Sequence, residues 1–221
     1  MTNSPLRIGV LASGKGSNLR AILTACKRKR LHGDVVVVIS DRAEALALTI
    51  ARRAGVEALA MDPKPYAARE QFDEAVVKEL QQRRVELIAL AGYMRIVTTK
   101  MIEPFRHRIM NIHPALLPAF PGLKAPQQAL DRGATLAGCT VHFVTEEVDG
   151  GPIIVQAAVP VRAGEPESSL ARRIQRQEHR LYPRAIDWFA RGRLRLDGRT
   201  VRVRGARVSP SAALVNPPLG G

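Results

Sequence analysis

The sequence has little cysteine and few aromatic residues. Its 221 residues include two cysteines, three tyrosines, five phenylalanines and one tryptophan. Cys26 and Cys139 lie far apart and show no C-x-x-C spacing, so neither a disulfide framework nor a zinc site is expected. We expect both cysteines to pack as apolar residues.

Long apolar runs are also missing. No stretch approaches the length of a membrane span, and residues 1–5 lack the charged and apolar regions of a signal peptide. A cytoplasmic protein without a membrane partner is therefore expected.

Acidic residues are in deficit, since 34 Lys and Arg oppose 20 Asp and Glu for a formal charge of +14. Such a balance invites a nucleic-acid interpretation through phosphate neutralisation. Many cations, however, fall at expected helix ends such as Lys27 to Arg30 or in the Arg-rich carboxyl-terminal stretch. Few aromatics are interleaved with them, so we expect no nucleic-acid partner and a field that attracts small anionic substrates.

Apolar, β-branched runs alternate with helical periodicity through the first half of the chain. The runs span residues 6–12, 34–39, 56–61, 86–91 and 108–112. Helical spacing of apolar residues appears in 19–26 and 72–80. This alternation predicts an α/β fold with a doubly wound, mostly parallel sheet in a single domain.

After Pro114 the pattern changes to a Pro- and Gly-rich loop that runs to Gly122. Further elements are expected as a short helix at 127–132, strands at 140–145 and 153–159, a long helix, and a hairpin at 194–203. Ser168 or Ser169 is expected to cap the long helix, which should run toward Ala190 with a kink at Pro183. The domain is thus expected to cover 1–203, followed by a disordered tail at 204–221.

The first strand runs into the turn Gly14-Lys15-Gly16-Ser17-Asn18, and a helix begins at once. A glycine-rich turn at a helix amino terminus presents backbone N–H groups that suit a phosphate. The alternative is an ordinary tight turn in which Ser17 is the N-cap residue. The pattern is neither GxxxxGK[ST] nor GxGxxG, which favours a single phosphomonoester over a nucleoside triphosphate or dinucleotide.

Asn111 and His113 lie where the fifth strand leaves the sheet, at the edge where open α/β folds place their sites. Residues two apart in a strand share a face, so a carboxamide and an imidazole can converge on one carbonyl. The amide could stabilise an oxyanion while the imidazole handles protons. The alternative is a turn containing a hydrogen-bonded histidine.

Asp149 is followed by Gly150 and Gly151 in a loop between two expected strands. An acid beside flexible glycines suits the orientation of a histidine, although an ordinary turn has the same composition. We expect His142 and His179 to be structural, each satisfied by a local hydrogen bond.

Four segments together resemble the phosphoribosylglycinamide formyltransferase family, in order and spacing, over about residues 6–203. The segments are Gly14-Lys15-Gly16-Ser17-Asn18-Leu19, Ala91-Gly92-Tyr93-Met94-Arg95-Ile96, Asn111-Ile112-His113-Pro114-Ala115-Leu116-Leu117-Pro118, and Val141-His142-Phe143-Val144 to Asp149-Gly150-Gly151-Pro152. The resemblance implies a Rossmann-like fold that moves a formyl group from 10-formyltetrahydrofolate to the amine of 5-phosphoribosylglycinamide in purine biosynthesis. It also implies a monomer or homodimer and no metal.

The resemblance further assigns roles to individual residues. Gly16, Ser17 and Asn18 would bind the substrate phosphate, with Gln175 and Glu178 at the ribose. Arg69, Met94, Arg95, Ile96, Val97 and Asn111 would bind the folate co-substrate. Asn111, His113 and Asp149 would be catalytic.

The chain departs from the family pattern at Lys124-Ala125-Pro126, where bacterial members commonly carry one or two histidines. Three alternatives remain. Methionyl-tRNA formyltransferase is similar but lacks the phosphate turn and carries an additional RNA-binding domain. A formyltetrahydrofolate deformylase normally has an amino-terminal regulatory domain, for which residues 1–5 leave no room. A basic nucleic-acid-binding module with a decayed pocket is the alternative from another class.

Overall fold

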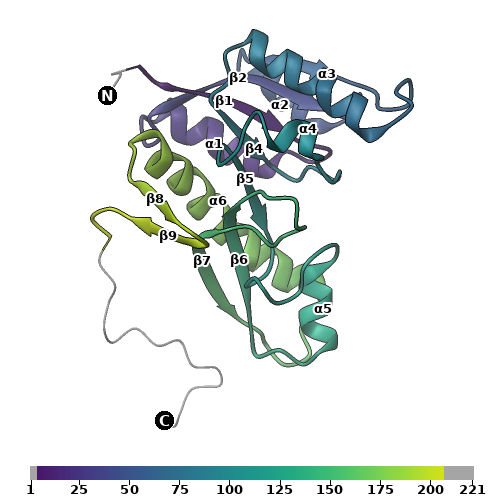
Figure 1. The fold of residues 1–221 in the computed structure, drawn as a ribbon. Helices are drawn as coiled ribbons and strands as arrows, with labels where there is room; N and C mark the ends of the chain where they lie inside the picture. Colours follow the sequence, from purple (N-terminus) through teal and green to yellow (C-terminus); the bar gives the residue numbers. More distant parts are fainter. Residues whose placement is uncertain (1–3, 207–221) are drawn as a thin grey trace.

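A seven-stranded sheet forms the centre of the molecule (Figure 1). The structure, a computed structural model, describes residues 4–206. The strand order is β3-β2-β1-β4-β5-β6-β7, in which β1 to β5 pair in parallel and β6 and β7 are antiparallel to their neighbours. The strands are β1 Leu6–Leu11, β2 Gly33–Ser40, β3 Glu57–Ala60, β4 Leu87–Leu90, β5 Ile109–His113, β6 Leu136–Phe143 and β7 Ile153–Pro160. The predicted mostly parallel α/β sheet is confirmed.

Helices cover both faces of the sheet, because parallel strands bury both faces. The helices are α1 Ser17–Lys27, α2 Leu46–Arg53, α3 Arg69–Gln82, α4 Thr99–Ile102, α5 Ala125–Asp131 and α6 Glu167–Ala190. One apolar cluster joins α1, α2 and α6 to the sheet, and the other joins α3 and α4 to the opposite face. Alternation along β1 explains the division, since Val10 lies in the first cluster and Leu11 in the second.

The long helix α6 is fixed to the centre of the sheet by Tyr182. This side chain is fully buried, and its hydroxyl lies 3.0 Å from the Leu90 carbonyl oxygen and 2.8 Å from that of Met110. Burial raises the pKa of Tyr182 well above its ordinary value, so the hydroxyl keeps its one proton and donates it to either carbonyl. These contacts hold α6 against β4 and β5, whose carboxyl ends carry the site.

Several element ends differ from the sequence-based expectation. The helix predicted from Ser168 or Ser169 begins at Glu167 after Pro166, with no side-chain cap, so the capping prediction is wrong. The extended Pro166 ends the preceding loop and fixes the start of α6 instead. The helix continues through Pro183, and the kink expected there stays a prediction. The sequence interpretation also missed α2 and α4, which are only eight and four residues long and so span few helical turns.

The predicted hairpin is present as β8 Leu194–Asp197 and β9 Thr200–Val203. Arg204 still pairs with Arg193, since its N–H donates to the Arg193 carbonyl at 2.7 Å and its carbonyl accepts from Arg193 Nε at 2.9 Å. The rest of the expected tail, residues 207–221, lies outside the described residues. Within residues 4–206, no helix combines the length and apolarity that a membrane crossing requires.

Two shortened chains test the expected boundary of the domain. A chain ending at Ala206 should keep its activity and its Tm within about 2 °C, because the domain is expected to end at residue 203. A chain ending at Val203 should lose a further few degrees with its two Arg193–Arg204 hydrogen bonds, each worth about 1 kcal/mol. Calorimetric melting of both chains would show this; loss of soluble protein on ending at Ala206 would contradict it.

Candidate active site

The turn between β1 and α1 has a shape that requires glycine at one position. Gly16 has φ +68°, and a Cβ added to it would lie 2.9 Å from the Ala47 Cα of α2. Gly16, not Ser17, is the N-cap residue, and no side chain caps the helix. The expectation of Ser17 as the cap is therefore wrong, because the left-handed glycine makes the entry into α1.

Two residues of α6 reach this turn. Gln175 Nε2 donates to Ser17 Oγ at 3.1 Å, and Asn18 Nδ2 donates to Glu178 Oε2 at 2.9 Å. The structure thus brings together Gly16, Ser17, Asn18, Gln175 and Glu178. Asn18 Nδ2 uses one of its two protons on Glu178, so the donors available to a ligand are the second Nδ2 proton, the Ser17 hydroxyl and the backbone N–H groups at the start of α1.

Glu178 is nearly buried, with 8% of its surface exposed. Burial raises its pKa, although the hydrogen bond from Asn18 acts in the opposite direction. Asn18 Oδ1 is buried and makes no hydrogen bond within the described chain. The pair therefore offers a ligand a carboxyl group that ionises reluctantly and an unused amide oxygen.

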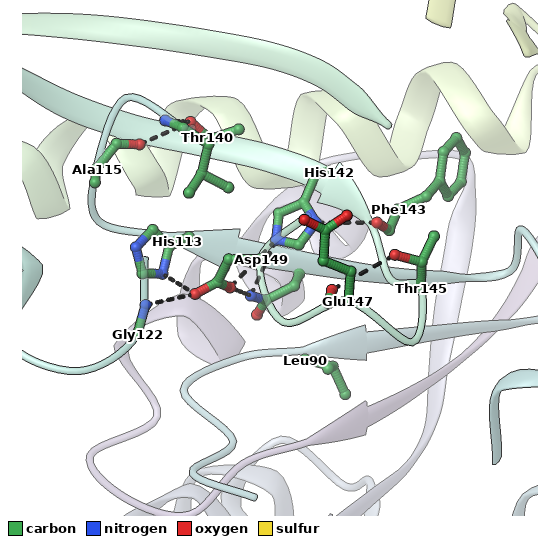
Figure 2. A network of polar contacts seen from close by, with 12 residues as sticks. Leu90, His113, Ala115, Gly122, Thr140, His142, Phe143, Thr145, Glu147 and Asp149 are labelled. Carbon is green, nitrogen blue, oxygen red and sulfur yellow. Dashed lines mark hydrogen bonds and ion pairs between the residues drawn. The ribbon is translucent and has the colours of Figure 1, made fainter. Parts of the chain in front are cut away.

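Asn111 and His113 share one face of β5, as the strand period predicts. Across the β5–β6 pair, Asn111 lies opposite His142. Asn111 is half-buried, whereas His113 and His142 are buried. Three polar side chains therefore meet at the carboxyl end of β5, of which His113 and His142 are labelled in Figure 2.

The loop after β6 brings Asp149 into this cluster (Figure 2). Asp149 has φ +54°, and a Cβ added to Gly151 would collide with the Phe143 carbonyl oxygen. Glycine at 151 therefore allows the loop to return against β6. The fold at this point depends on close backbone contact, and the left-handed Asp149 directs its carboxylate inward.

Four donors surround the Asp149 carboxylate. Gly122 N–H donates to Oδ2 at 2.8 Å, and Asn111 Nδ2 donates to Oδ1 at 3.4 Å. His113 Nδ1 lies 3.3 Å from Oδ2, and His142 Nε2 lies 3.7 Å from Oδ1. Burial raises the pKa of Asp149, but the His142 and Gly122 hydrogen bonds and the charge of the histidines outweigh it and lower the pKa.

His113 faces an acceptor at each ring nitrogen. Nε2 lies 2.9 Å from the Phe120 carbonyl oxygen, which can only accept, so Nε2 carries a proton. Nδ1 faces the ionised Asp149 carboxylate, which also accepts. Both ring nitrogens of His113 therefore face oxygen acceptors, one neutral and one negatively charged.

His142 makes the local hydrogen bond expected of it, from Nδ1 to the Phe143 carbonyl oxygen at 2.9 Å. It also contacts the cluster, since Nε2 lies 3.3 Å from Asn111 Nδ2. Sequence reasoning missed this second role, because only the pairing register of β5 and β6 reveals it. The expectation for His179 is wrong, since its Nε2 is buried with no hydrogen-bond partner in residues 4–206. The ring packs between α1 and α6, where Arg20 offers no acceptor.

A cavity of about 410 Å³ opens beside the cluster. Met94, Arg95, Ile96 and Val97 line it together with Asn111, His113, His142 and Asp149. Arg69, at the start of α3, is not among its lining residues. Four apolar residues here have at least half of their surface exposed: Met94 57%, Ile96 56%, Leu123 74% and Val148 50%. An exposed apolar rim around polar groups is typical of a pocket for a flat organic ligand.

Sequence reasoning did not single out Leu123 or Val148, which come from two different loops. Lys124 also lines this cavity in a left-handed conformation, φ +56°. A cation therefore stands where the family commonly has histidine. Because Lys124 lines the cavity, the segment Lys124-Ala125-Pro126, which departs from the family pattern, is placed where it could alter a contact with the substrate.

The β8–β9 hairpin holds the Asp149 loop from outside. Arg199, between the two strands, donates from Nη2 to the Gly150 carbonyl at 2.7 Å. The same guanidinium lies 3.7 Å from Glu147 Oε2. Two residues of the loop, Glu147 and Gly150, are thus tied to the hairpin through a single side chain.

Comparisons with known proteins agree with this geometry. The family model described as formyl transferase matches residues 6–186. Phosphoribosylglycinamide formyltransferase of Escherichia coli (strain K12) is 42% identical, over 93% of this chain and 97% of that protein. The crystal structure of glycinamide ribonucleotide transformylase 1 from Symbiobacterium toebii is 58% identical with a TM-score of 0.90, covering 90% of this chain and 94% of that one. A formyltetrahydrofolate deformylase from Pseudomonas syringae is 27% identical with a TM-score of 0.83, covering 91% of this chain and 66% of that one.

The turn at Gly16 offers a stability test with an internal control. Gly16→Ala should lower the free energy of unfolding by about 1–3 kcal/mol, because alanine is strained at positive φ and meets Ala47. Gly14→Ala, two residues earlier, should change it by less than about 0.5 kcal/mol, because its φ is not positive and its Cβ would meet open space. Urea unfolding of both variants measures the difference, and equal values would contradict it.

Proposed function

The chain belongs to the formyl transferase family, and we propose that it moves the formyl group of 10-formyltetrahydrofolate to the amine of 5-phosphoribosylglycinamide in purine biosynthesis. The products are formylglycinamide ribonucleotide and tetrahydrofolate. The observation that carries the proposal is that one edge of the sheet holds both an anion-binding helix start at Gly16 and the cluster around Asp149. A formyl donor and a phosphorylated amine need these two neighbouring sites.

The phosphate of the substrate binds at the start of α1 in this proposal. Backbone N–H groups of Ser17 and Asn18 donate to it, and the helix dipole favours its negative charge. Gln175 and Glu178, which contact the same turn from α6, meet the ribose hydroxyls. The amine then extends from this turn toward Asn111 and His113.

The folate binds in the cavity of about 410 Å³. Met94 to Val97 form one wall, and the exposed Leu123 and Val148 cover the ring system from the other side. The formyl group then lies beside Asn111. Arg69 does not line this cavity, so a contact from it stays a prediction for parts of the folate that extend outside.

Attack of the amine on the formyl carbon forms a tetrahedral intermediate with a negatively charged oxygen. Asn111 Nδ2 donates to this oxygen, and the contacts that it gives up, at 3.3 and 3.4 Å, are long and therefore weak. Cationic His113 adds positive charge beside the oxyanion. His113 donates its proton to the folate nitrogen as the carbon–nitrogen bond breaks, and the neutral imidazole then takes the proton that the attached amine releases, while Asp149 stays ionised beside it.

A deformylase reaction is the second candidate, because a deformylase shares the fold. Water would then replace the amine as nucleophile. The Gly16 turn favours transfer, since hydrolysis needs no phosphate site. The predictions of a cytoplasmic location, a monomer or homodimer, no nucleic-acid partner and a metal-free reaction stay predictions.

Absorbance of the folate separates the two reactions. The spectrum of 10-formyltetrahydrofolate should change in the presence of the protein and 5-phosphoribosylglycinamide, and the change should stop when the ribonucleotide is left out. The rate without ribonucleotide should be below one-hundredth of the full rate. Equal rates with and without it would identify a hydrolase instead.

Asp149→Asn should collapse turnover while leaving both ligands bound. Removing the charge beside His113 costs preorganised electrostatic stabilisation of the transition state, so kcat should fall by two or more decades, about 3 kcal/mol. Asp131→Asn makes the same change on the exposed surface of α5 and should leave kcat within about twofold. Steady-state kinetics and titration calorimetry would show a fall in kcat with little change in ligand affinity; near-normal turnover removes Asp149 from the mechanism.

The same variant has a pH signature in stability. The fold lowers the pKa of Asp149, so its carboxylate contributes stability above the pKa of the unfolded chain, about 3.9. That contribution is lost as pH falls through the lowered pKa. The difference in unfolding free energy between the protein and Asp149→Asn should therefore shrink below about pH 4, and a constant difference would contradict the pKa shift.

A further inference from the structure

A second and larger cavity lies between α1 and α6, next to the proposed phosphate turn. Its volume is about 1130 Å³, and Ser17 and Gln175 line it together with residues near the carboxyl ends of both helices. We call it the α1–α6 groove. The mechanism uses only its inner end, at Ser17 and Gln175.

Arginine and lysine dominate the walls of the groove. Eight such side chains line it, four from α1 and the turn after it and four from α6 and the turn after it. On the α1 side, Arg20, Arg28, Lys29 and Arg30 are exposed, and none of their side chains has a hydrogen-bond or ion-pair partner in residues 4–206. Cations without internal partners are available to a ligand.

The ordinary explanation is that these cations complement the helix carboxyl termini. The number of positive charges is too large for it. The two helix ends supply about half a negative charge each. Asp187 is the single carboxylate of the described lining, and Arg184, Arg191 and the His32 N–H already contact it. About six positive charges therefore remain uncompensated, far more than the helix ends require.

His179 adds an independent indication from inside the groove. It lies on α6 one turn after Gln175, and its Nε2 is buried without a partner in the described chain. Burial lowers the pKa of His179, and the charge of Arg20 lowers it further. The ring therefore stays neutral in the unliganded groove, and Nε2 can form a hydrogen bond with a polar group of a ligand.

We propose that the α1–α6 groove is a second binding site for phosphate-bearing anions, adjoining the turn that takes the substrate phosphate. Its geometry supports this, since the groove is continuous with the turn and carries an uncompensated positive charge. The inference rests on the proposed function only for the source of the anion. That source is either the ribonucleotide substrate on its way to the turn or a different phosphorylated metabolite.

Calorimetric titration with inorganic pyrophosphate tests the groove without catalysis. The variant Arg28→Gln/Lys29→Gln/Arg30→Gln should bind pyrophosphate at least fivefold more weakly than the unaltered protein. Arg52→Gln/Arg53→Gln/Lys78→Gln removes the same charge from exposed positions of α2 and α3, outside the groove, and should bind it as the unaltered protein does. Arg180→Gln, a change on the α6 wall of the groove, should also weaken pyrophosphate binding. Equal affinity of the two triple variants would overturn the proposal.

Kinetics at varied ionic strength identify the source of the anion. If the substrate uses the groove, the groove variant loses about fivefold in kcat/KM for the ribonucleotide at low salt, keeps its kcat, and converges with the control at high salt. If kcat/KM is unchanged while pyrophosphate binding is weakened, the groove serves another phosphorylated ligand. Absence of formyl transfer in the unaltered protein would refute the proposed function alone, because pyrophosphate binding does not depend on it.

Discussion

The site depends on one constraint, that the half-buried Asp149 carboxylate, with 10% of its side chain exposed, needs hydrogen-bond donors from the protein. An ionised carboxylate away from water is costly unless it is paired. Its donors come from the end of β5, from Gly122 in the next loop, and from His142 of β6. These groups lie on three different segments, so their contacts with one carboxylate fix the relative positions of the three segments.

The same demand explains the backbone around the carboxylate. Only a loop that folds tightly against β6 can bring Asp149 within reach of Gly122, and Gly151 permits this close approach to Phe143. The antiparallel β5–β6 register then places His142 opposite Asn111. The antiparallel β6 therefore lets a short connection bring His142 beside Asn111. A parallel neighbour would reach β5 only through a long crossover.

Local patterns in the sequence were enough to predict the parallel strands, the Gly16 turn and the shared face of Asn111 and His113, whereas β6, predicted at 140–145, spans Leu136–Phe143. Strand period and helix periodicity are short-range properties, and they hold in the structure. The contacts of Asn18 with Glu178 and of His142 with Asn111 could not be predicted, because they depend on how α6 docks and on strand register. The basic residues Lys27 to Arg30 were interpreted as helix-end charges, and only the packing of α1 against α6 reveals them as one wall of a groove.

Arg199 lies near the end of the described chain, so its contact with the Asp149 loop can form only late in synthesis. A chain emerging from the ribosome presents β1 to β5 first, and domains fold as their sequence becomes available. Tyr182, however, supplies the contact to Leu90 and Met110, and Arg199 supplies the outer tie to the Asp149 loop. A nascent chain that has exposed Asn111 and His113, the two residues of β5 proposed to be catalytic, therefore still lacks these contacts, which form only after the hairpin has been made.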